Sequence, residues 1–122
     1  MPRVIHFEIY VDDVQRAIKF YDDTFGWKSQ GWEGPQEYFL VTTGDENQPG
    51  ITGAIMKRPG PGATGVNYIE VPSVDEFIQK TVAGGGSVTM PNMAIPGVGY
   101  AAHCQDTEGN PFGLFQDDSS AS

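Results

Sequence analysis

A helical pattern that recurs after 60 residues constrains this chain more than any other feature. Residues 13–26 and residues 73–86 each place apolar or small side chains along one stripe of a helix. The stripes comprise Val14, Ala17, Ile18, Tyr21 and Phe25 in the first segment and Val74, Phe77, Ile78 and Thr81 in the second. Four positions match at the same offset, so the sequence predicts two copies of one supersecondary unit.

The ends of the two predicted helices support this repeat. Asp13 is a good N-cap for the first helix, and Ser73 with Glu76 forms a capping box for the second. Glycine follows each helix, as Gly26 in one copy and as residues 84–86 in the other, where a left-handed C-cap is favourable.

Strand patterns surround each helix in the same order. The alternating segments VIHFEIYV and VNYIEV precede the helices, and three strand candidates follow each one. These candidates are residues 27–32, 37–43 and 51–58 in the first copy and residues 87–91, 98–105 and 111–116 in the second. The turn-rich segments EGPQ, GDENQPG, PNMAIPG and DTEGNP separate them. The sequence therefore predicts an α+β fold of two βαβββ modules in a single domain, with module one at 3–58, a linker at 59–64, module two at 65–116 and a tail at 117–122.

The first predicted strand carries three polar side chains in a row. His6, Glu8 and Tyr10 alternate with an apolar set at residues 7, 9 and 11, so they share one face of the strand. Histidine exchanges protons near neutral pH, and so does a carboxyl group that is buried away from cations. The row is therefore a candidate acid–base site, and the alternatives are a metal corner, a structural hydrogen-bonded pair or an ordinary exposed face.

Charge and cysteine content narrow the classes of partner. Seven basic and sixteen acidic residues give a net charge of −9, which disfavours nucleic acid and anionic membrane surfaces and is compatible with a cationic ligand. The single cysteine, Cys104, fits a reducing compartment. Residues 1–13 lack the apolar region of a signal peptide, and no apolar run approaches the roughly 18 residues of a membrane span, so we expect a cytoplasmic protein.

The linker contains a glycine motif that matches nucleotide-binding loops in spacing but not in context. Gly60, Gly62 and Gly65 have the spacing of a dinucleotide-binding loop, whose last glycine opens a helix that holds the pyrophosphate. A strand follows here instead, so we expect no nucleotide.

The sequence resembles the vicinal oxygen chelate superfamily in three segments, which are HFEIYVDDVQRAIKFYDDTFGW, AGGGSV and DTEGNPFGLFQ. This superfamily includes glyoxalase I, bleomycin-resistance proteins, fosfomycin-resistance enzymes and extradiol dioxygenases. The resemblance implies that the two modules form a cup-shaped mixed sheet with the helices outside. It implies that one strand lines the cup with His6, Glu8 and Tyr10 and the other with Val66, Tyr68 and Glu70. A small-molecule ligand and a homodimer are further implications.

The resemblance also assigns metal-ligand positions, and most of them are empty. His6 occupies the first position, whereas Val66 stands at the second and Gly113 at the last. Residues 52–54, at the matching strand of module one, offer no imidazole or carboxylate. We therefore expect no cofactor, and the alternative is a divalent metal held by His6, Glu8 and Glu70.

The functional prediction is glyoxalase-like chemistry on a small molecule in the cup. The candidate catalytic residues are His6, Glu8 and Glu70, with a glutamate as the base and His6 as the acid or ligand, in a proton abstraction next to a carbonyl of isomerase, epimerase or lyase type. The candidate substrate-binding residues are Tyr10, Trp32, Tyr68, Tyr100 and His103. The alternatives are a non-catalytic protein that binds a drug or cationic ligand, as the bleomycin-resistance proteins do, and an interaction domain without a small ligand.

Overall fold

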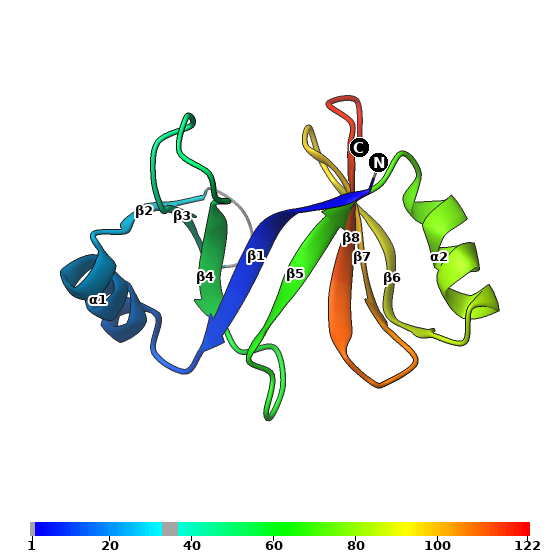
Figure 1. The fold of residues 1–122 in the computed structure, drawn as a ribbon, viewed down its shortest axis with the longest axis horizontal. Helices are drawn as coiled ribbons and strands as arrows, with labels where there is room; N and C mark the ends of the chain where they lie inside the picture. The colour runs from blue at the N-terminus through cyan, green and yellow to red at the C-terminus, as the bar shows by residue number, and fades with distance from the viewer. Residues whose placement is uncertain (1, 33–36) are drawn as a thin grey trace. The chain divides into compact units, whose positions relative to one another are not determined.

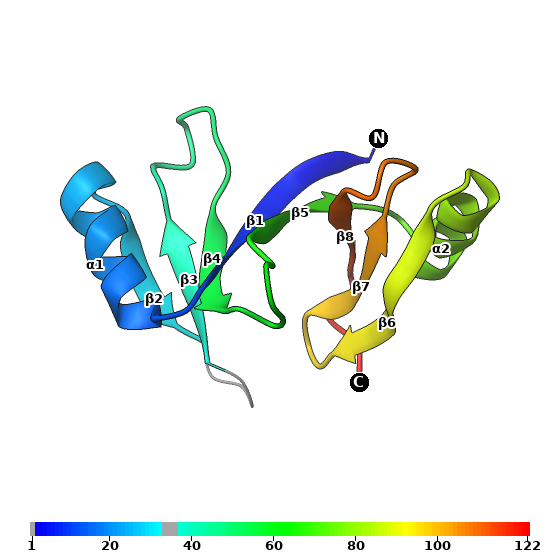
Figure 2. The ribbon, with the colours of Figure 1, turned by 90° about the horizontal axis from the view of Figure 1, so that it is seen from below.

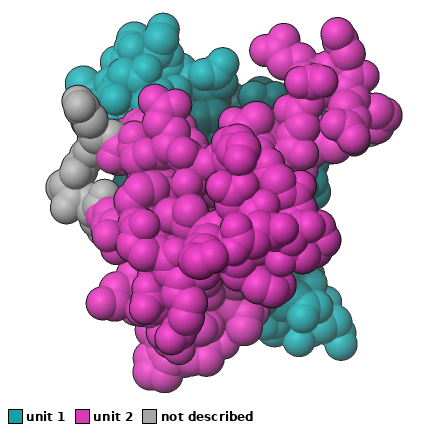
Figure 3. All heavy atoms as spheres, turned by 90° about the vertical axis from the view of Figure 1, so that its left-hand side faces the viewer, with its two compact units in different colours: residues 1–5, 67–122 teal, residues 6–66 magenta. Residues whose placement is uncertain are grey.

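The computed structural model describes residues 2–32 and 37–122, which divide into two compact units (Figure 3). The amino-terminal unit comprises residues 6–66 and is unit 2 of the figure. The carboxy-terminal unit, unit 1 of the figure, comprises residues 67–122 together with the first residues of the chain. The turn predicted at EGPQ lies outside the described residues.

The amino-terminal unit has the predicted order β-α-β-β-β (Figure 1). Its elements are β1 (Arg3–Val11), α1 (Val14–Phe25), β2 (Lys28–Gly31), β3 (Tyr38–Thr42) and β4 (Gly53–Lys57). The strands lie side by side in the order β2-β3-β4-β1. The β1 and β4 strands are parallel, and the other two pairs are antiparallel.

The carboxy-terminal unit repeats this order and topology. Its elements are β5 (Gly65–Glu70), which enters this unit at residue 67, and then α2 (Val74–Ala83), β6 (Ser87–Ile95), β7 (Gly99–Gln105) and β8 (Pro111–Asp117). The strand order is β5-β8-β7-β6, with β5 parallel to β8 and the other pairs antiparallel. The prediction of two βαβββ modules is confirmed.

One predicted turn is wrong. The segment PNMAIPG was expected to end the strand at residue 91, but β6 continues to Ile95. Its register against β7 shifts between Val88 and Met90 and again between Met90 and Met93. A register shift of this kind lets a strand accommodate Pro91, which lacks the backbone N–H that a regular ladder needs.

In each unit the helix covers one face of its own strands (Figure 2). Val14 of α1 packs on Val41 and Ile55 of the strands, and Val74 of α2 packs in a second cluster with Val71, Ala102, Cys104 and Leu114. Most of the first predicted stripe faces this core, whereas Phe25 is 60% exposed at the end of the helix. No helix in the described parts of the chain has the length and apolar character that crossing a membrane requires.

The predicted N-caps and the left-handed C-cap of α1 are present, whereas Gly84, the C-cap of α2, is right-handed with φ of −83°. Asp13 accepts a hydrogen bond from the backbone N–H of Arg16, and Ser73 accepts one from that of Glu76. Gly26 adopts a left-handed conformation with φ of 76°, which glycine reaches without a steric penalty. Each helix is therefore delimited by local sequence signals.

Arg58 fastens the segment after β4 to the end of β1. Its backbone N–H donates to the carbonyl of Val11 at 2.9 Å, its Nε donates to Asp12 at 3.0 Å, and its Nη1 donates to the carbonyl of Ala63. Beyond this clamp, the N–H of Tyr10 donates to the carbonyl of Thr64 at 3.0 Å. The linker predicted at 59–64 is thus held against β1 within the amino-terminal unit.

Removing this clamp should lower the stability of the protein. We expect Arg58→Ala to reduce the free energy of unfolding by about 1–2 kcal/mol, because the Ala63 carbonyl loses a charged donor. Asp12→Asn serves as the control and should have a smaller effect, since the Asp12 side chain is 75% exposed. Urea denaturation of the two variants measures this, and equal losses would contradict the role given to the Ala63 contact.

Candidate functional site

Three residues of β1 and one of β3 form a hydrogen-bonded group in the amino-terminal unit, which we call the Glu8 network: His6, Glu8, Tyr10 and Tyr38. The Tyr10 hydroxyl donates to Oε1 of Glu8 at 2.8 Å, and the Tyr38 hydroxyl donates to Oε2 at 2.8 Å. The Nε2 atom of His6 lies 2.9 Å from the same Tyr38 hydroxyl. Glu8 is 7% exposed, so a buried carboxylate accepts two phenolic hydrogens.

Strand alternation and register explain how these four side chains meet. Ile9 and Val11 pack toward α1, and Phe7 places its ring 5.8 Å from that of Trp27, so the even-numbered residues of β1 face the other side of the sheet. Met56 of β4 stands opposite both Tyr10 and Tyr38, which puts all three residues in one row across the strands. Because row neighbours in a sheet share a face, Tyr38 lies on the face of Glu8.

A small residue leaves room for the Tyr38 side chain. Ala54 is fully buried and lies opposite Glu8 in one pairing and opposite Leu40 in the other. Its methyl group takes little space on this face, which allows a tyrosine from two strands away to reach the carboxylate. Trp32 packs its ring edge-to-face on Tyr38, with 6.0 Å between centroids, and its backbone N–H donates to the Tyr38 carbonyl at 2.8 Å.

The hydrogen bonds also define which nitrogen of His6 carries a hydrogen. Tyr38 has one hydroxyl hydrogen and gives it to Glu8, so it can only accept from His6. Nε2 of His6 is therefore the protonated nitrogen, and the lone pair of the neutral imidazole is on Nδ1. The hydrogen bonds therefore run from His6 to Tyr38 and from Tyr38 to Glu8.

Burial adjusts the acidity of the other network members. Burial raises the pKa of both Tyr10 and Tyr38, and the charge and hydrogen bond of Glu8 raise each pKa further. Both phenols therefore remain protonated donors at physiological pH. Burial also lowers the pKa of His6 below its usual value, while the negative charge of Glu8 partly opposes this shift. His6 is consequently neutral near pH 7.

The lowered pKa of His6 predicts a pH dependence of stability. Below a pH of about 6.5 the unfolded chain binds a proton at His6 that the folded chain resists, so the contribution of His6 to stability is present above that pH and falls as the pH drops. We expect an NMR titration to give His6 a pKa below the usual histidine value, and Glu8→Gln should lower this pKa further because it removes the opposing charge. A higher His6 pKa in Glu8→Gln would contradict the electrostatic role of Glu8.

A second pair of polar side chains lies in the carboxy-terminal unit. The Tyr68 hydroxyl is 2.6 Å from Nε2 of His103, and the two rings are T-shaped with centroids 5.5 Å apart. Tyr68 stands opposite Gly113 in the register of β5 and β8, and a Cβ built at Gly113 would lie 2.4 Å from the tyrosine ring. The ring thus occupies the space that any side chain at Gly113 would need.

Two predicted site residues lie elsewhere in this unit. Tyr100 packs against the core cluster under α2, on the opposite face of β7 from His103, because alternate residues of a strand face opposite sides. Glu70 is exposed and lies opposite Phe115 at the end of β5. Tyr100 and Glu70 are therefore outside both polar groups. Cys104 is fully buried, and this burial raises the pKa of its thiol.

Tyr38 is the site residue that the sequence did not reveal. Its segment YFLVT alternates, and Phe39 and Val41 are the members that contact the α1 core. This alternation places Tyr38 on the opposite face, but it does not say which strand will lie beside β3. The pairing through β4 supplies that information, and it depends on the register of three strands.

The metal-ligand positions that the superfamily resemblance assigns do not fit a metal in this chain. Val66 has no donor atom, and Gly113 has no side chain and lies under the Tyr68 ring. Within residues 2–32 and 37–122, no three histidine, cysteine, aspartate or glutamate side chains are grouped as metal ligands are. The structure supplies the aromatic ring of Tyr68 where a ligand would stand, so we derive no chemical step through a metal.

Comparison with known proteins agrees with this architecture. The family model of the Glyoxalase/Bleomycin resistance protein/Dioxygenase superfamily matches residues 3–114. The chain therefore belongs to this superfamily, as its sequence motifs predicted.

Two relatives show how far the similarity extends. CFP32 from Mycobacterium bovis and Mycobacterium tuberculosis, named a putative glyoxylase, is 31% identical over 120 residues, which cover 89% of this chain and 43% of the relative. The chain thus spans less than half the length of these mycobacterial relatives. A glyoxylase-like domain-containing protein from Didymella fabae is 33% identical over 110 residues, which cover 84% of both chains.

Solved structures share the fold at low sequence identity. Methylmalonyl-CoA epimerase from Mycobacterium tuberculosis has a TM-score of 0.70 at 13% identity, with 94% of this chain and 87% of the epimerase covered. This level of identity supports the fold alone.

Proposed function

We propose that the Glu8 network carries out proton transfer on a small carbonyl compound, with His6 as the acid–base group. The observation that supports this most strongly is the connection from a neutral imidazole, through Tyr38, to a buried carboxylate. When His6 accepts a proton, the negative charge of Glu8 stabilises the imidazolium that forms. Tyr38 and Glu8 orient the His6 imidazole, as hydrogen-bonded partners orient the base in other acid–base sites.

The hydrogen bonds favour His6 rather than Glu8 as the group that moves the proton. Each oxygen of Glu8 already accepts a phenolic hydrogen, one from Tyr10 and one from Tyr38. Glu8 is therefore better suited to stabilise positive charge on His6 than to abstract a proton itself. This differs from the role that the sequence suggested for Glu8.

The proposed step is proton abstraction from a carbon next to a carbonyl. His6 takes the proton, the C–H bonding electrons move into an enolate, and the imidazolium, whose proton can first exchange with solvent, returns a proton to carbon. Return to the opposite face gives an epimer, and return to a neighbouring carbon gives an isomer. Expulsion of a leaving group from the enolate would make the reaction a lyase reaction.

Hydrogen–deuterium exchange detects such a step whatever the final product is. A panel of ketones, aldehydes and thioesters is incubated with the protein in D2O, and exchange at the carbon beside the carbonyl is followed by proton NMR. We expect exchange with the wild type and a rate lowered about tenfold or more in Tyr38→Phe, which keeps the ring but breaks the connection to Glu8. Equal exchange rates in the two proteins would contradict the role of Tyr38.

A second candidate function is ligand binding without chemistry. Trp32 is 37% exposed and packs on Tyr38 beside the acidic network, and an exposed tryptophan face attracts cations and aromatic rings. A compound that binds in the same panel but shows no exchange would favour this function. The Tyr68–His103 pair remains a proposed ligand-binding element of its own unit.

We expect the protein to function without a metal or other cofactor, as a homodimer, in the cytoplasm. Metal analysis of protein purified without a histidine tag and sedimentation at several concentrations test the first two of these.

A further inference from the structure

Most basic side chains of the chain bind acidic partners or an aromatic ring. We infer that the Glu8 network takes an uncharged or cationic carbonyl compound with an apolar body and discriminates against anionic substrates, including coenzyme A thioesters. This inference rests on the proton-transfer site proposed above.

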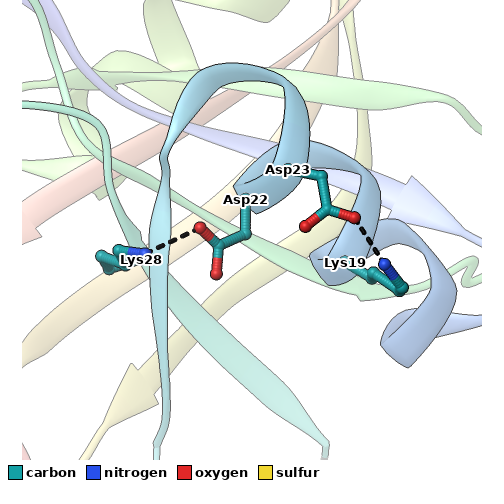
Figure 4. A network of polar contacts seen from close by, with 4 residues as sticks. All are labelled: Lys19, Asp22, Asp23 and Lys28. Carbon is teal, nitrogen blue, oxygen red and sulfur yellow. Dashed lines mark hydrogen bonds and ion pairs between the residues drawn. The ribbon is translucent and has the colours of Figure 1, made fainter.

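Every basic residue of the amino-terminal unit belongs to α1 or to the strand ends beside it. Lys19 binds Asp23 at 2.5 Å, and Lys28 binds Asp22 at 2.8 Å (Figure 4). The other three gather around Asp12, whose pKa is lowered by the hydrogen bond and charge of Arg58 and by the nearby charges of Arg16 and Lys57.

Strand parity separates most of these cations from the network. Lys57 stands opposite Val11, so it has the parity of the residues that pack toward α1. Lys28 stands opposite Thr42 and shares the parity of Tyr38, but its ammonium is directed to Asp22 of the helix instead (Figure 4). Among the described residues of this unit, the lysine and arginine side chains are therefore directed toward Asp12, Asp22 and Asp23.

The two remaining basic residues of the chain are also directed elsewhere. The sequence has seven lysines and arginines in total, so only Arg3 and Lys80 are left. The Lys80 ammonium lies over the ring of Phe77 on α2, 4.8 Å from its centroid. Arg3 is three residues before His6 in β1, so the two side chains face opposite sides of the strand.

The charge of the network itself is negative. His6 is neutral and both phenols are protonated near pH 7, so Glu8 contributes the one formal charge among the four side chains. An anionic substrate would meet this carboxylate without a lysine or arginine directed to it from the strands of its own unit. At close range such repulsion lowers affinity by about tenfold or more.

The backbone elements that commonly bind phosphate are also acidic or misplaced. A free helix N-terminus attracts anions, but the N-terminus of α1 is capped by the Asp13 carboxylate. The first turn of α2 contains Asp75 and Glu76. The glycine-rich segment through Gly65 leads into β5 rather than into a helix. The name of the structurally similar epimerase includes a coenzyme A thioester. Such a thioester carries several phosphate charges, and the backbone elements described above are not arranged to bind them.

The apolar part of the inference comes from the neighbours of Tyr38 on the same face. Leu40 has the parity of Tyr38 in β3 and is 40% exposed, and Met56 lies between Tyr10 and Tyr38. With Trp32 packed on Tyr38, these side chains place apolar and aromatic surface next to the acid–base group. Such a combination suits a carbonyl compound with a hydrocarbon or aromatic body.

A matched set of probes tests the inference. The probes are 4-methylacetophenone, 4-acetylphenyltrimethylammonium, 4-acetylbenzoate and acetyl-coenzyme A. Dissociation constants are measured by tryptophan fluorescence at low salt, with Trp32→Phe assigning the signal to this face. We expect 4-acetylbenzoate and acetyl-coenzyme A to bind about tenfold or more weakly than the neutral ketone, and added salt should narrow this gap.

Two variants with the same loss of charge provide the control. Glu8→Gln should narrow the gap between neutral and anionic probes, whereas Glu46→Gln, at an exposed position, should preserve it. Binding of 4-acetylbenzoate or acetyl-coenzyme A within about twofold of the neutral ketone would overturn the inference, since the predicted repulsion would then be absent. Selective binding of the neutral probe without deuterium exchange would support the inference and contradict the proposed proton transfer.

Discussion

Replacing His6 with alanine is expected to slow deuterium exchange of a reactive carbonyl compound by about a hundredfold or more, the usual contribution of a positioned acid–base group. The loss follows from the network geometry, because the imidazole is the member that can change its charge near neutral pH. The Tyr38 hydroxyl would lose its donor at 2.9 Å, while Glu8 would keep both phenols. Initial exchange rates measured by proton NMR over a range of substrate concentrations check this result.

Two controls separate a chemical role of His6 from a structural one. Added imidazole should restore part of the exchange in His6→Ala, since a small base can enter the space left by the side chain. Tyr100→Phe removes a hydroxyl from the face of β7 that packs under α2. This variant should catalyse exchange at the wild-type rate. An His6→Ala protein that folds normally and exchanges as fast as the wild type would exclude His6 as the acid–base group.

Substituting alanine for Gly113 is expected to cost about 2–3 kcal/mol of the free energy of unfolding, as other insertions into packed sites do. The new Cβ would approach three atoms of the Tyr68 ring to within 2.4–2.9 Å. Tyr68 is 8% exposed and its hydroxyl is 2.6 Å from His103, so the ring cannot move without breaking that contact or disturbing the strand. Urea denaturation followed by far-UV circular dichroism measures the change.

A double-mutant cycle identifies the source of this cost. Tyr68→Ala combined with Gly113→Ala should lose less stability than the sum of the two single variants, because the ring that the new methyl group meets is gone. Gly60→Ala is the matched control, since a Cβ there meets nothing within 4 Å, and it should change stability by less than about 0.5 kcal/mol. Additive losses in the cycle would show that the Tyr68 ring is not what fills the space at Gly113.

The packing of Tyr68 explains why one expected metal-ligand position, residue 113, is a glycine. From the sequence, Gly113 was simply a residue without a donor atom. In the structure it is the residue that allows an aromatic side chain to lie against β8. A glycine in a strand often marks such a close approach. Restoring a carboxylate at this position would therefore require the removal of Tyr68 as well.

Local patterns determined the elements and one face of the site. The 60-residue repeat, the caps at Asp13 and Ser73 and the alternation around His6 are all properties of neighbouring residues, and they predicted both helices and the polar face of β1. Such patterns are reliable because helix capping and strand alternation depend on contacts within a few residues.

Side chains that meet across strands could not be predicted in the same way. The partnership of Tyr38 with Glu8 depends on β3 and β1 both pairing with β4 in a fixed register. Likewise, the parity of β7 separates Tyr100 from His103, but only the packing under α2 shows which of the two faces the core. Sequence patterns thus predict the repeat, the fold class and the polar row of His6, Glu8 and Tyr10. The tertiary structure decided that Tyr38 completes the row, because a register between strands is set by long-range packing that no short segment encodes.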